Sequence, residues 1–390
     1  MKKLTSFILA ALILLTASVL PALAENPPQG PQEQGPARKT GILTLLNTTE
    51  EEYAAYKAAR QAIYDLLIRD GSVQMEVPDG IEAASDEELP PPPPEGPFPA
   101  PDGQATPAEP AKGESPSAII FYDSLDSMIM ALEAREISSM EIYQSTAKYL
   151  CANNDRLVMI HPIDLSKERS KHAEIAISTR LANDFSFLML ESSTALRDEF
   201  NTAILAMKED GTLDKLIREQ ITDLIDGKEI APVKMPEIEG VEAVTVAVTG
   251  DLPPMDYVGA DGIPAGFNSA VLAEISRRIG KPIKLIVVSS PARAVALASG
   301  RADVIFWTRG CTVSDALAMM SEEERSAWKA ESEAGLSEND TALIESLEAM
   351  APAASIGSQD MPQGTIITEP YYTDVLVPVE LGRDSSKSAE

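Results

Sequence analysis

The sequence predicts an α/β fold, because short apolar strands alternate with amphipathic helices along much of its 390 residues. The clearest stretch runs from 244 to 310 and reads as strand, polar loop, turn, helix, strand, helix, strand. A second alternation covers residues 118–224. We therefore expect strands covered by helices in both halves of the chain.

The N-terminal residues have the features of an export signal. Two lysines precede an apolar run over 7–20, and Ala22-Leu23-Ala24 fits a small-residue cleavage site. We expect a signal peptide over 1–24, with cleavage after Ala24, and a disordered leader over 25–39. No later apolar run is long enough for a transmembrane helix. The mature chain is thus predicted to be soluble and either periplasmic or secreted.

Residues 40–227 form the first predicted half. A strand over 41–46 is followed by a helix, because Thr48 and Thr49 precede three glutamates and Glu51 is spaced for a capping box. Residues 71–116 are rich in proline and predict a linker. The remaining elements are strands at 118–121, 140–142, 157–160 and 185–190, and helices at 124–134, 145–150, 194–207 and 213–224.

Residues 228–241 are a predicted linker, and 242–382 form the second half. This half carries an acidic, helical insertion within 311–365, in which Ser321 is a predicted helix cap before three glutamates. A disordered tail is expected over 383–390. The pair Asp261-Gly262 predicts a turn. The expected strands are 244–248, 283–288, 303–307 and 375–379, and the expected helices are 269–279, 292–298 and one or more within 321–350.

The stretch 244–310 resembles the first half of lobe 1 in type II periplasmic solute-binding proteins of the amino-acid type, family 3. The resemblance implies a two-lobed fold with the ligand held between the lobes, an ABC permease as partner, and a monomer. The residues that carry it are Gly250, Pro253, Pro254, Tyr257, Asp261, Gly262, Pro264, Gly266, Phe267, Ile275, Gly280, Ala296, Leu297, Ser299, Gly300, Asp303, Val304 and Ile305.

The order of the family-like segments is unusual. Residues 123–150 resemble the late part of lobe 2, and 185–221 resemble the closing segment of lobe 1, yet both precede 244–310. One interpretation is a single circularly permuted domain. The other is two degenerate tandem copies. We favour permutation, because the segments are complementary and surface hinges tolerate new termini.

Charge and cysteine content exclude several functions. The formal net charge of −29 argues against binding nucleic acid or an anionic membrane. Cys151 and Cys311 lie far apart and do not indicate a disulfide scaffold. With two histidines and no CxxC motif, the sequence predicts neither a metal site nor a cofactor.

Candidate ligand-binding residues are those expected in loops that face the space between the lobes. Arg309 is the leading one, because the resemblance implies an arginine beyond this strand that clamps a ligand carboxylate. Thr48, Thr49 and Gln144 lie at helix starts, where backbone amides favour anions. The other candidates are Asp251, Tyr257, Phe267, Asn268, Trp307 and Thr308.

The leading functional hypothesis is therefore an exported solute-binding protein that captures a small polar ligand, amino-acid-like or a carboxylate, for an ABC importer. The lobe 2 stretch Ile142-Tyr143-Gln144 lacks the acid that the resemblance implies for an amino-acid ammonium group. A degenerate binding or sensory module of the same fold is the first alternative. A dehydratase or lyase is the second, although no catalytic pair is evident.

Overall fold

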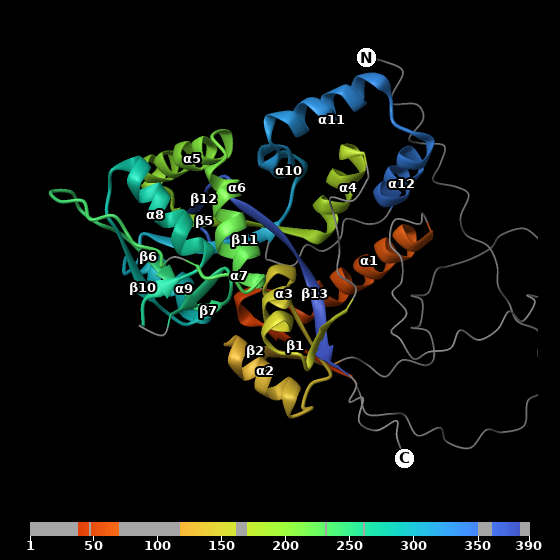
Figure 1. Ribbon diagram of the computed structural model, residues 1–390, viewed down its shortest axis with the longest axis horizontal. Coiled ribbons are helices and arrows are strands. Elements are labelled where there is room, and N and C mark those ends of the chain that lie inside the picture. The colour runs from red at the N-terminus through yellow and green to blue at the C-terminus, as the bar shows by residue number, and fades with distance from the viewer. Residues whose placement is uncertain are drawn as a thin grey trace, which may run out of the picture. The chain divides into compact units, whose positions relative to one another are not determined.

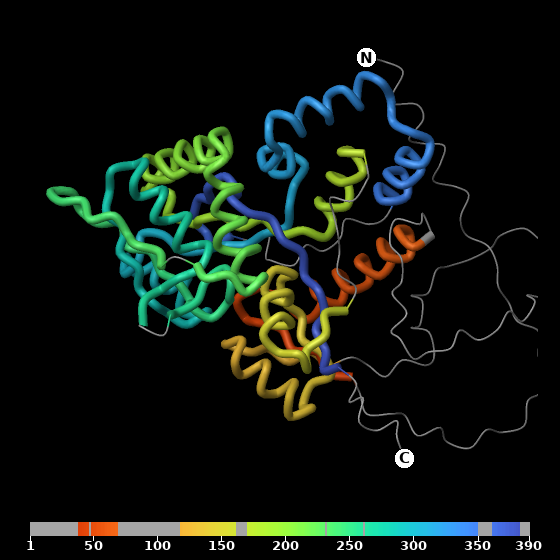
Figure 2. Tube along the Cα trace, viewed as in Figure 1, coloured from red at the N-terminus to blue at the C-terminus, as the bar shows by residue number. Residues whose placement is uncertain are grey.

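A computed structural model describes residues 38–46, 48–69, 118–160, 170–230, 232–259, 262–349 and 361–382 (Figures 1 and 2). The predicted signal peptide, most of the predicted leader, the Pro-rich linker and the C-terminal tail lie outside these residues. The α/β prediction is confirmed, because helices flank a mixed sheet in both halves of the described chain. Among the described residues, no helix has the length and apolarity needed to cross a membrane.

The first sheet is built mainly from the first half of the chain. Strand β1 (Lys39–Leu43) pairs in parallel with β2 (Ala118–Tyr122) on one side and β3 (Ser139–Tyr143) on the other. The sheet continues through β13 (Tyr372–Leu381), which runs antiparallel to β3 and also pairs with β4 (Leu157–Met159).

The second sheet repeats this pattern with strands from the second half. Strand β6 (Val244–Val248) lies between β10 (Ile283–Val287) and β11 (Val304–Gly310), and all three are parallel. The next strand, β5 (Ala182–Leu190), is antiparallel to β11 and comes from the first half of the chain. Strand β12 (Thr365–Ile367) pairs with the far end of β5.

Two strands connect the sheets. Strand β5 belongs to the first half of the chain but pairs with β11 in the second sheet. Strand β13 belongs to both sheets, since Tyr372–Val375 pairs with β5 while Leu376–Leu381 pairs with β3 and β4. Figure 1 shows β13, in blue, passing from the neighbourhood of β11 to that of β1. Each half of the chain therefore contributes a strand to the sheet built by the other.

Helices cover the sheets through apolar faces. In the first half they are α1 (Glu50–Arg69), α2 (Leu125–Glu133), α3 (Gln144–Asn153) and α4 (Lys171–Leu181). Helix α5 (Thr194–Glu209) follows β5 and contacts α6 (Thr212–Ile217) and α8 (Phe267–Ile279). A π-helical turn (Arg218–Thr222) and α7 (Asp223–Ile225) complete the first half, and α9 (Arg293–Ala298) lies between β10 and β11.

The predicted acidic insertion is helical within its described part. Helices α10 (Val313–Met319), α11 (Glu322–Ala334) and α12 (Glu338–Ala349) all contact α4. The predicted cap at Ser321 is confirmed, because its hydroxyl accepts from the Glu324 amide and Glu324 completes a capping box. The ring of His172 stacks on Trp328 with centroids 4.9 Å apart, which attaches α11 to α4.

Several expected boundaries differ from the structure. Lys39, placed in the disordered leader, belongs to β1, and residues 44–46 form a 3₁₀ turn rather than the end of that strand. Helix α4 was not expected, and β5 begins three residues before 185. Strand β11 extends to Gly310 instead of ending at Trp307, because β5 pairs with it as far as Gly310↔Asn183. Long-range pairing, which local composition does not reveal, sets these limits.

Candidate functional site

The two sheets approach each other where several of their parallel strands end. We call this region the seam. On the first sheet it is defined by Leu45, which follows β1, and by Tyr143, the last residue of β3. On the second sheet it is defined by Asp251, which follows β6, and by Ser290 and Arg293, which follow β10. The turns at 44–46 and 290–292 contact each other. Ligands of open α/β sheets bind beyond the carboxyl ends of the strands, so the seam is the candidate site.

Arg293 lies at the centre of the seam and is only 2% exposed. Its Nη2 donates to the Leu45 carbonyl at 3.0 Å, on the side of the first sheet. Its Nη1 donates to the Phe306 carbonyl at 3.0 Å and its Nε to the Ser290 carbonyl at 3.2 Å, on the side of the second. Burial lowers the pKa of Arg293 to about 10.

Polar atoms without a hydrogen-bond partner gather around this arginine. They are the Tyr143 hydroxyl, the Asp251 Oδ1 and the Ser290 Oγ, each buried and unpartnered among the described residues. The Tyr143 hydroxyl lies near Thr308 but makes no well-formed bond to it. Because an unmatched buried polar group is costly, these atoms favour a bound water or ligand at the seam. Asp184 Oδ2 and Arg309 Nε, near Asp315, are unpartnered in the same way among the described residues.

Two carboxylates lie on the second-sheet side of the seam. Burial raises the pKa of Asp251 and that of Asp256, and the charge of Arg293 partly opposes this in Asp251. Asp256 Oδ2 accepts from the Thr249 amide at 2.9 Å and the Thr249 hydroxyl at 3.1 Å, so it fixes the loop after β6. The Oδ1 of Asp251, in contrast, accepts no hydrogen bond among the described residues.

Residues 244–314 match the family model described as bacterial extracellular solute-binding proteins, family 3. This segment is similar to that family. It contains β6, the seam residues Asp251, Ser290 and Arg293, and all of β11. The resemblance found in the sequence is therefore confirmed over this stretch, and the match supports a ligand-binding role. The matched family is one of binding proteins.

Solved structures of binding proteins also align with the chain. They include NikZ from Campylobacter jejuni in complex with Ni(L-His), 10% identical over 68% of this chain and 56% of that one, with a TM-score of 0.33. NikA from Staphylococcus aureus in complex with Ni(L-His)2 is 9% identical over 68% and 57%, with a TM-score of 0.31. DppA from Helicobacter pylori, in complex with peptide STSA, is 12% identical over 68% and 54%, with a TM-score of 0.30.

The chain thus spans little more than half the length of these structures, between 54% and 57%. Their TM-scores lie near 0.3, so the arrangement of this chain is taken from its own sheets and not from these structures. No curated protein sequence matches the chain.

Arg309, the leading candidate in the solute-binding segment, is paired within the chain. It lies in β11, and its Nη2 contacts both Asp315 carboxylate oxygens at 2.8 Å. Asp315 also accepts from the Thr312 hydroxyl at 2.5 Å. Neighbouring Asp184 is fully buried, and burial together with the charge of Asp315 raises its pKa to about 7. The carboxylate that Arg309 binds in this structure is Asp315.

The helix starts proposed as anion sites also have internal partners. Asp374 of β13 accepts from the Ser145 amide at 3.1 Å and the Ser145 hydroxyl at 2.6 Å, at the start of α3 beside Gln144. The capping box of α1 lies one residue later than expected. Thr49 and Glu52 form it, while Thr48 donates to Glu52 over 3.4 Å.

The remaining candidates fall into two groups. Phe267 and Asn268 were expected in a loop, but they are the first residues of α8 and are buried. The Phe267 ring centroid is 5.3 Å from that of Tyr372, and Asn268 accepts from the Tyr371 hydroxyl at 2.9 Å. Gly266 permits this helix start, since its φ is +97° and a Cβ would lie 2.7 Å from the Pro254 carbonyl.

Trp307, Thr308 and Tyr257 lie nearer the seam. Trp307 packs in the apolar cluster beneath α9, with its Nε1 unpartnered among the described residues. Thr308 neighbours Tyr143. Tyr257 pairs with Asp251 across the small antiparallel ribbon of β7 (Asp251–Leu252) and β8 (Asp256–Val258). Their roles as ligand contacts stay predictions.

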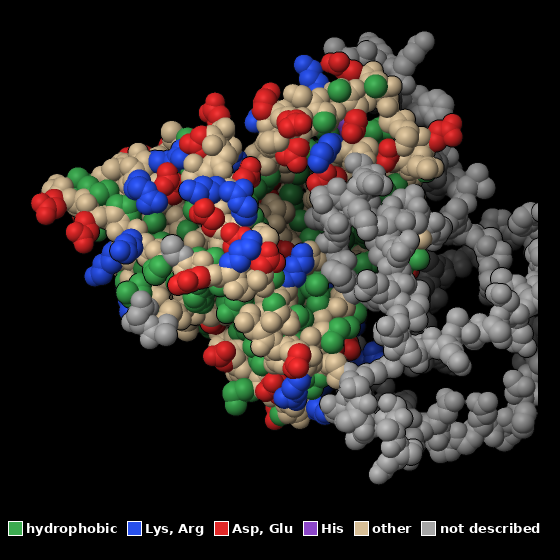
Figure 3. Space-filling model, viewed as in Figure 1, with side chains coloured by type: hydrophobic (Ala, Val, Ile, Leu, Met, Phe, Trp, Pro, Cys, Tyr) green, Lys and Arg blue, Asp and Glu red, His purple; other side chains and the backbone are tan. Residues whose placement is uncertain are grey.

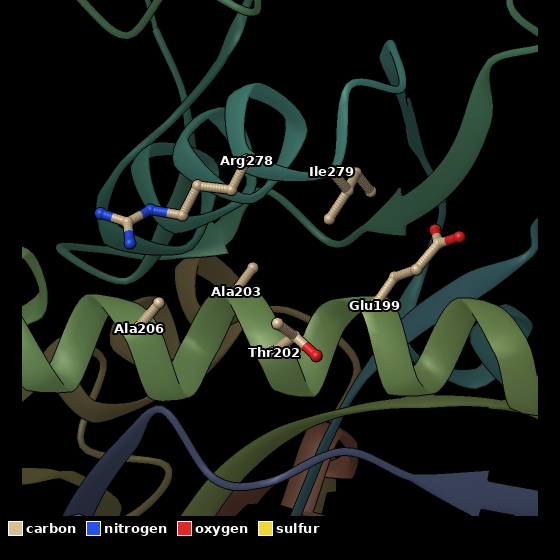
Figure 4. Close-up of a pocket in the computed structure, with 6 residues that line it drawn as sticks. All are labelled: Glu199, Thr202, Ala203, Ala206, Arg278 and Ile279. Atoms are coloured by element: carbon tan, nitrogen blue, oxygen red, sulfur yellow. The ribbon is translucent and has the colours of Figure 1, made fainter.

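A hollow of about 390 Å³ lies elsewhere, between α5 and α8 (Figure 4). Its charged residues already have partners, because Arg278 binds Asp210 and Glu274 while Glu199 binds Lys281. Figure 3 shows acidic and basic side chains interspersed over the surrounding face, as on an ordinary solvated surface. Its lining residues are Glu199, Thr202, Ala203, Ala206, Arg278 and Ile279.

Arg293 is not among the residues predicted from the sequence, although one local signal indicates it. It is the first residue of a helix, where the helix dipole disfavours a cation.

Within the described part of the chain, no group of acids, histidines and cysteines could hold a metal ion. Both cysteines are free thiols.

Proposed function

We propose that the chain is an exported solute-binding protein that captures a small polar ligand, amino-acid-like or a carboxylate, at the seam and presents it to an ABC importer. The family match over 244–314 supports the class of function. The observation that carries the choice of site is the group of buried, unpartnered polar atoms of Tyr143, Asp251 and Ser290 around Arg293. The predicted signal over 1–24 supports a periplasmic or secreted location.

The mechanism in this proposal is closure of the two sheets over the ligand. Each sheet contributes polar atoms to the seam, so a ligand that contacts both binds the closed arrangement better than an open one. The strands β5 and β13 connect the sheets and would act as the hinge. The exchange of strands between halves supports the permuted, two-lobed organisation that we propose.

Ligand-induced stabilisation tests the proposal. The mature chain from Glu25 onward is melted with amino acids, their hydroxy and keto analogues, and small dicarboxylates. A ligand at a hundred times its dissociation constant adds about 2.7 kcal/mol to the free energy of unfolding. We expect a shift that Tyr143→Phe or Ser290→Ala reduces. A matched control is Ser299→Ala, whose hydroxyl donates to the Val295 carbonyl on the exposed side of α9.

A second candidate is a binding or sensory module that has lost its ligand. The specific observation in its favour is that the predicted anion-binding groups are already paired: Arg309 with Asp315, and the start of α3 with Asp374. Under this hypothesis the panel produces no shift in the wild-type chain. Asp315→Asn, which releases Arg309, would then restore binding of a carboxylate.

A further inference from the structure

We propose that His172 is a pH-sensitive latch for the acidic insertion, and that its charged, doubly protonated ring holds α11 on α4. This inference goes beyond the proposed function and does not depend on which ligand the seam binds. The predicted export of the chain would expose such a latch to the pH of the surroundings.

Helix α11 is docked without a hydrophobic core of its own. It packs on α4, yet none of its residues is buried. The neighbouring α12, in contrast, buries Leu343 and Leu347. Because apolar burial does not hold α11 in place, its polar and stacking contacts with the start of α4 decide whether it stays docked.

His172, in the first turn of α4, lies at the centre of these contacts. Its ring stacks on that of Trp328, with centroids 4.9 Å apart and planes inclined by 17°. Its Nδ1 lies 3.2 Å from Glu331 Oε2, and its Nε2 lies 2.8 Å from Ser332 Oγ. One imidazole therefore contacts three residues of α11.

The hydrogen bonds around the ring require a proton on both nitrogens. A carboxylate only accepts, so the Nδ1 that faces Glu331 must donate. The Ser332 hydroxyl donates its single hydrogen to the Trp328 carbonyl at 3.0 Å, so its oxygen must accept from Nε2. A neutral imidazole has one N–H group and would lose one of these bonds. The docked arrangement thus matches the imidazolium form of His172.

The surrounding charges also favour a cation at this position. Glu331 accepts from the Lys171 amide at 3.2 Å, and the Lys171 Nζ lies 2.8 Å from Glu174 and 3.4 Å from Glu324. Three carboxylates therefore share one lysine until His172 is charged. The His172 side chain is only 20% exposed and that of Glu331 32%, so solvent screens their attraction less than on an open surface. An imidazolium also binds an indole face better than a neutral ring does.

The other helices that pack on α4 direct charged groups to partners elsewhere. These pairs are Glu348 of α12 with Arg180, Asp315 of α10 with Arg309, and Arg60 of α1 with Glu141. On α11 itself, Arg325 pairs with Glu322 on the exposed side. The charge of His172 is therefore governed by Glu331 and by the cluster around Lys171.

The direction of the pH response follows from the proton count. Docking of α11 takes up a proton at His172, so low pH favours the docked position. Raising the pH through the range in which histidine loses its charge, about 5 to 8, should release α11 from α4.

Fluorine NMR of the full mature chain labelled with fluorotryptophan tests the latch. The chain has two tryptophans, so Trp328→Phe assigns the signals, and the change in shift between H₂O and D₂O reports the exposure of Trp328. We expect a small solvent-induced change at low pH and a larger one at high pH. His172→Gln should give the larger change at both pH values. His172→Arg, a permanent cation that stacks and donates, should give the smaller change at both.

The matched control is Glu333→Gln, made beside Glu331→Gln. Both remove one carboxylate from α11, but Glu333 is exposed and its loss should leave the pH response unchanged, whereas Glu331→Gln should weaken docking at low pH. A Trp328 signal that ignores pH in the wild-type chain, or that responds equally in His172→Gln, overturns the inference. Equal effects of the two glutamate changes overturn it as well. Ligand binding at the seam is measured separately, so none of these outcomes decides the proposed function.

Discussion

At the scale of single residues, buried carboxyl groups dominate the electrostatics of the molecule. Asp184 is the clearest case, because it is fully buried, accepts from Thr373 at 2.9 Å, and leaves its Oδ2 unpartnered among the described residues. Its folded pKa of about 7 lies above the ordinary value of 3.8. The folded state therefore holds a proton that the unfolded state releases.

Stability should fall as the pH rises from about 4 to 7, since in this window only the unfolded chain ionises Asp184. The slope reaches about 1.4 kcal/mol per pH unit for one proton. Asp184→Asn keeps an acceptor for Thr373 and should reduce this slope, which urea unfolding at several pH values would measure. A smaller slope of the same sign should remain, because burial also raises the pKa of Asp374, to about 6. Asp198→Asn, on an exposed carboxylate, is the control. An unchanged slope in Asp184→Asn would show that the group is ionised in the fold.

The buried pair of Arg60 and Glu141 makes a second residue-scale prediction. Tyr53 also donates to Glu141, so the carboxylate is fully engaged beneath α1. Glu141→Gln leaves the arginine charge buried and uncompensated, at a cost of about 3–5 kcal/mol in urea unfolding. Glu133→Gln breaks an exposed pair with Arg156 and should cost less than about 1 kcal/mol. Equal effects would contradict the assigned burial.

At the scale of elements, the cap of α11 was predicted at the correct residue, whereas the capping box of α1 lies one residue later than expected. Ser321 and the glutamates after it indicated a helix start, and the structure has a capping box there. Ser321→Ala should cost about 1 kcal/mol. Because α11 has no buried residue, the effect should be local. Hydrogen exchange should accelerate in α11 while β5 and β11 keep their protection, and global destabilisation would refute a local role.

The elements of 244–310 could be predicted because each contains its own signal. Strand β6 consists mostly of β-branched residues. Helix α8 has an apolar stripe and ends at Gly280, whose φ is +67°. The length of β11 and the pairing of Arg309 could not be predicted, since both depend on partners set by the tertiary fold. The cross-seam bond of Arg293 also depends on the tertiary fold, as its acceptor lies 248 residues away, although the position of Arg293 at a helix start is a local signal.

At the scale of the whole molecule, β13 joins both sheets. Its first residues pair with β5 and its later residues with β3 and β4. Removing residues 361–390 should therefore unfold both sheets together, as seen by loss of the single melting transition and of the β-sheet signal in circular dichroism. Removing only 383–390 should have little effect. A truncated chain that keeps one folded sheet would contradict this coupling.

The same exchange of strands makes the two halves mutually dependent for assembly. If the chain were cut between α7 and β6, the first fragment would hold β5 without its sheet, and the second would hold β13 without its partners. Each fragment carries the strand that completes the other. The protein is thus suited to a split reporter, in which two separately expressed pieces regain structure only when a fused pair of interacting proteins brings them together.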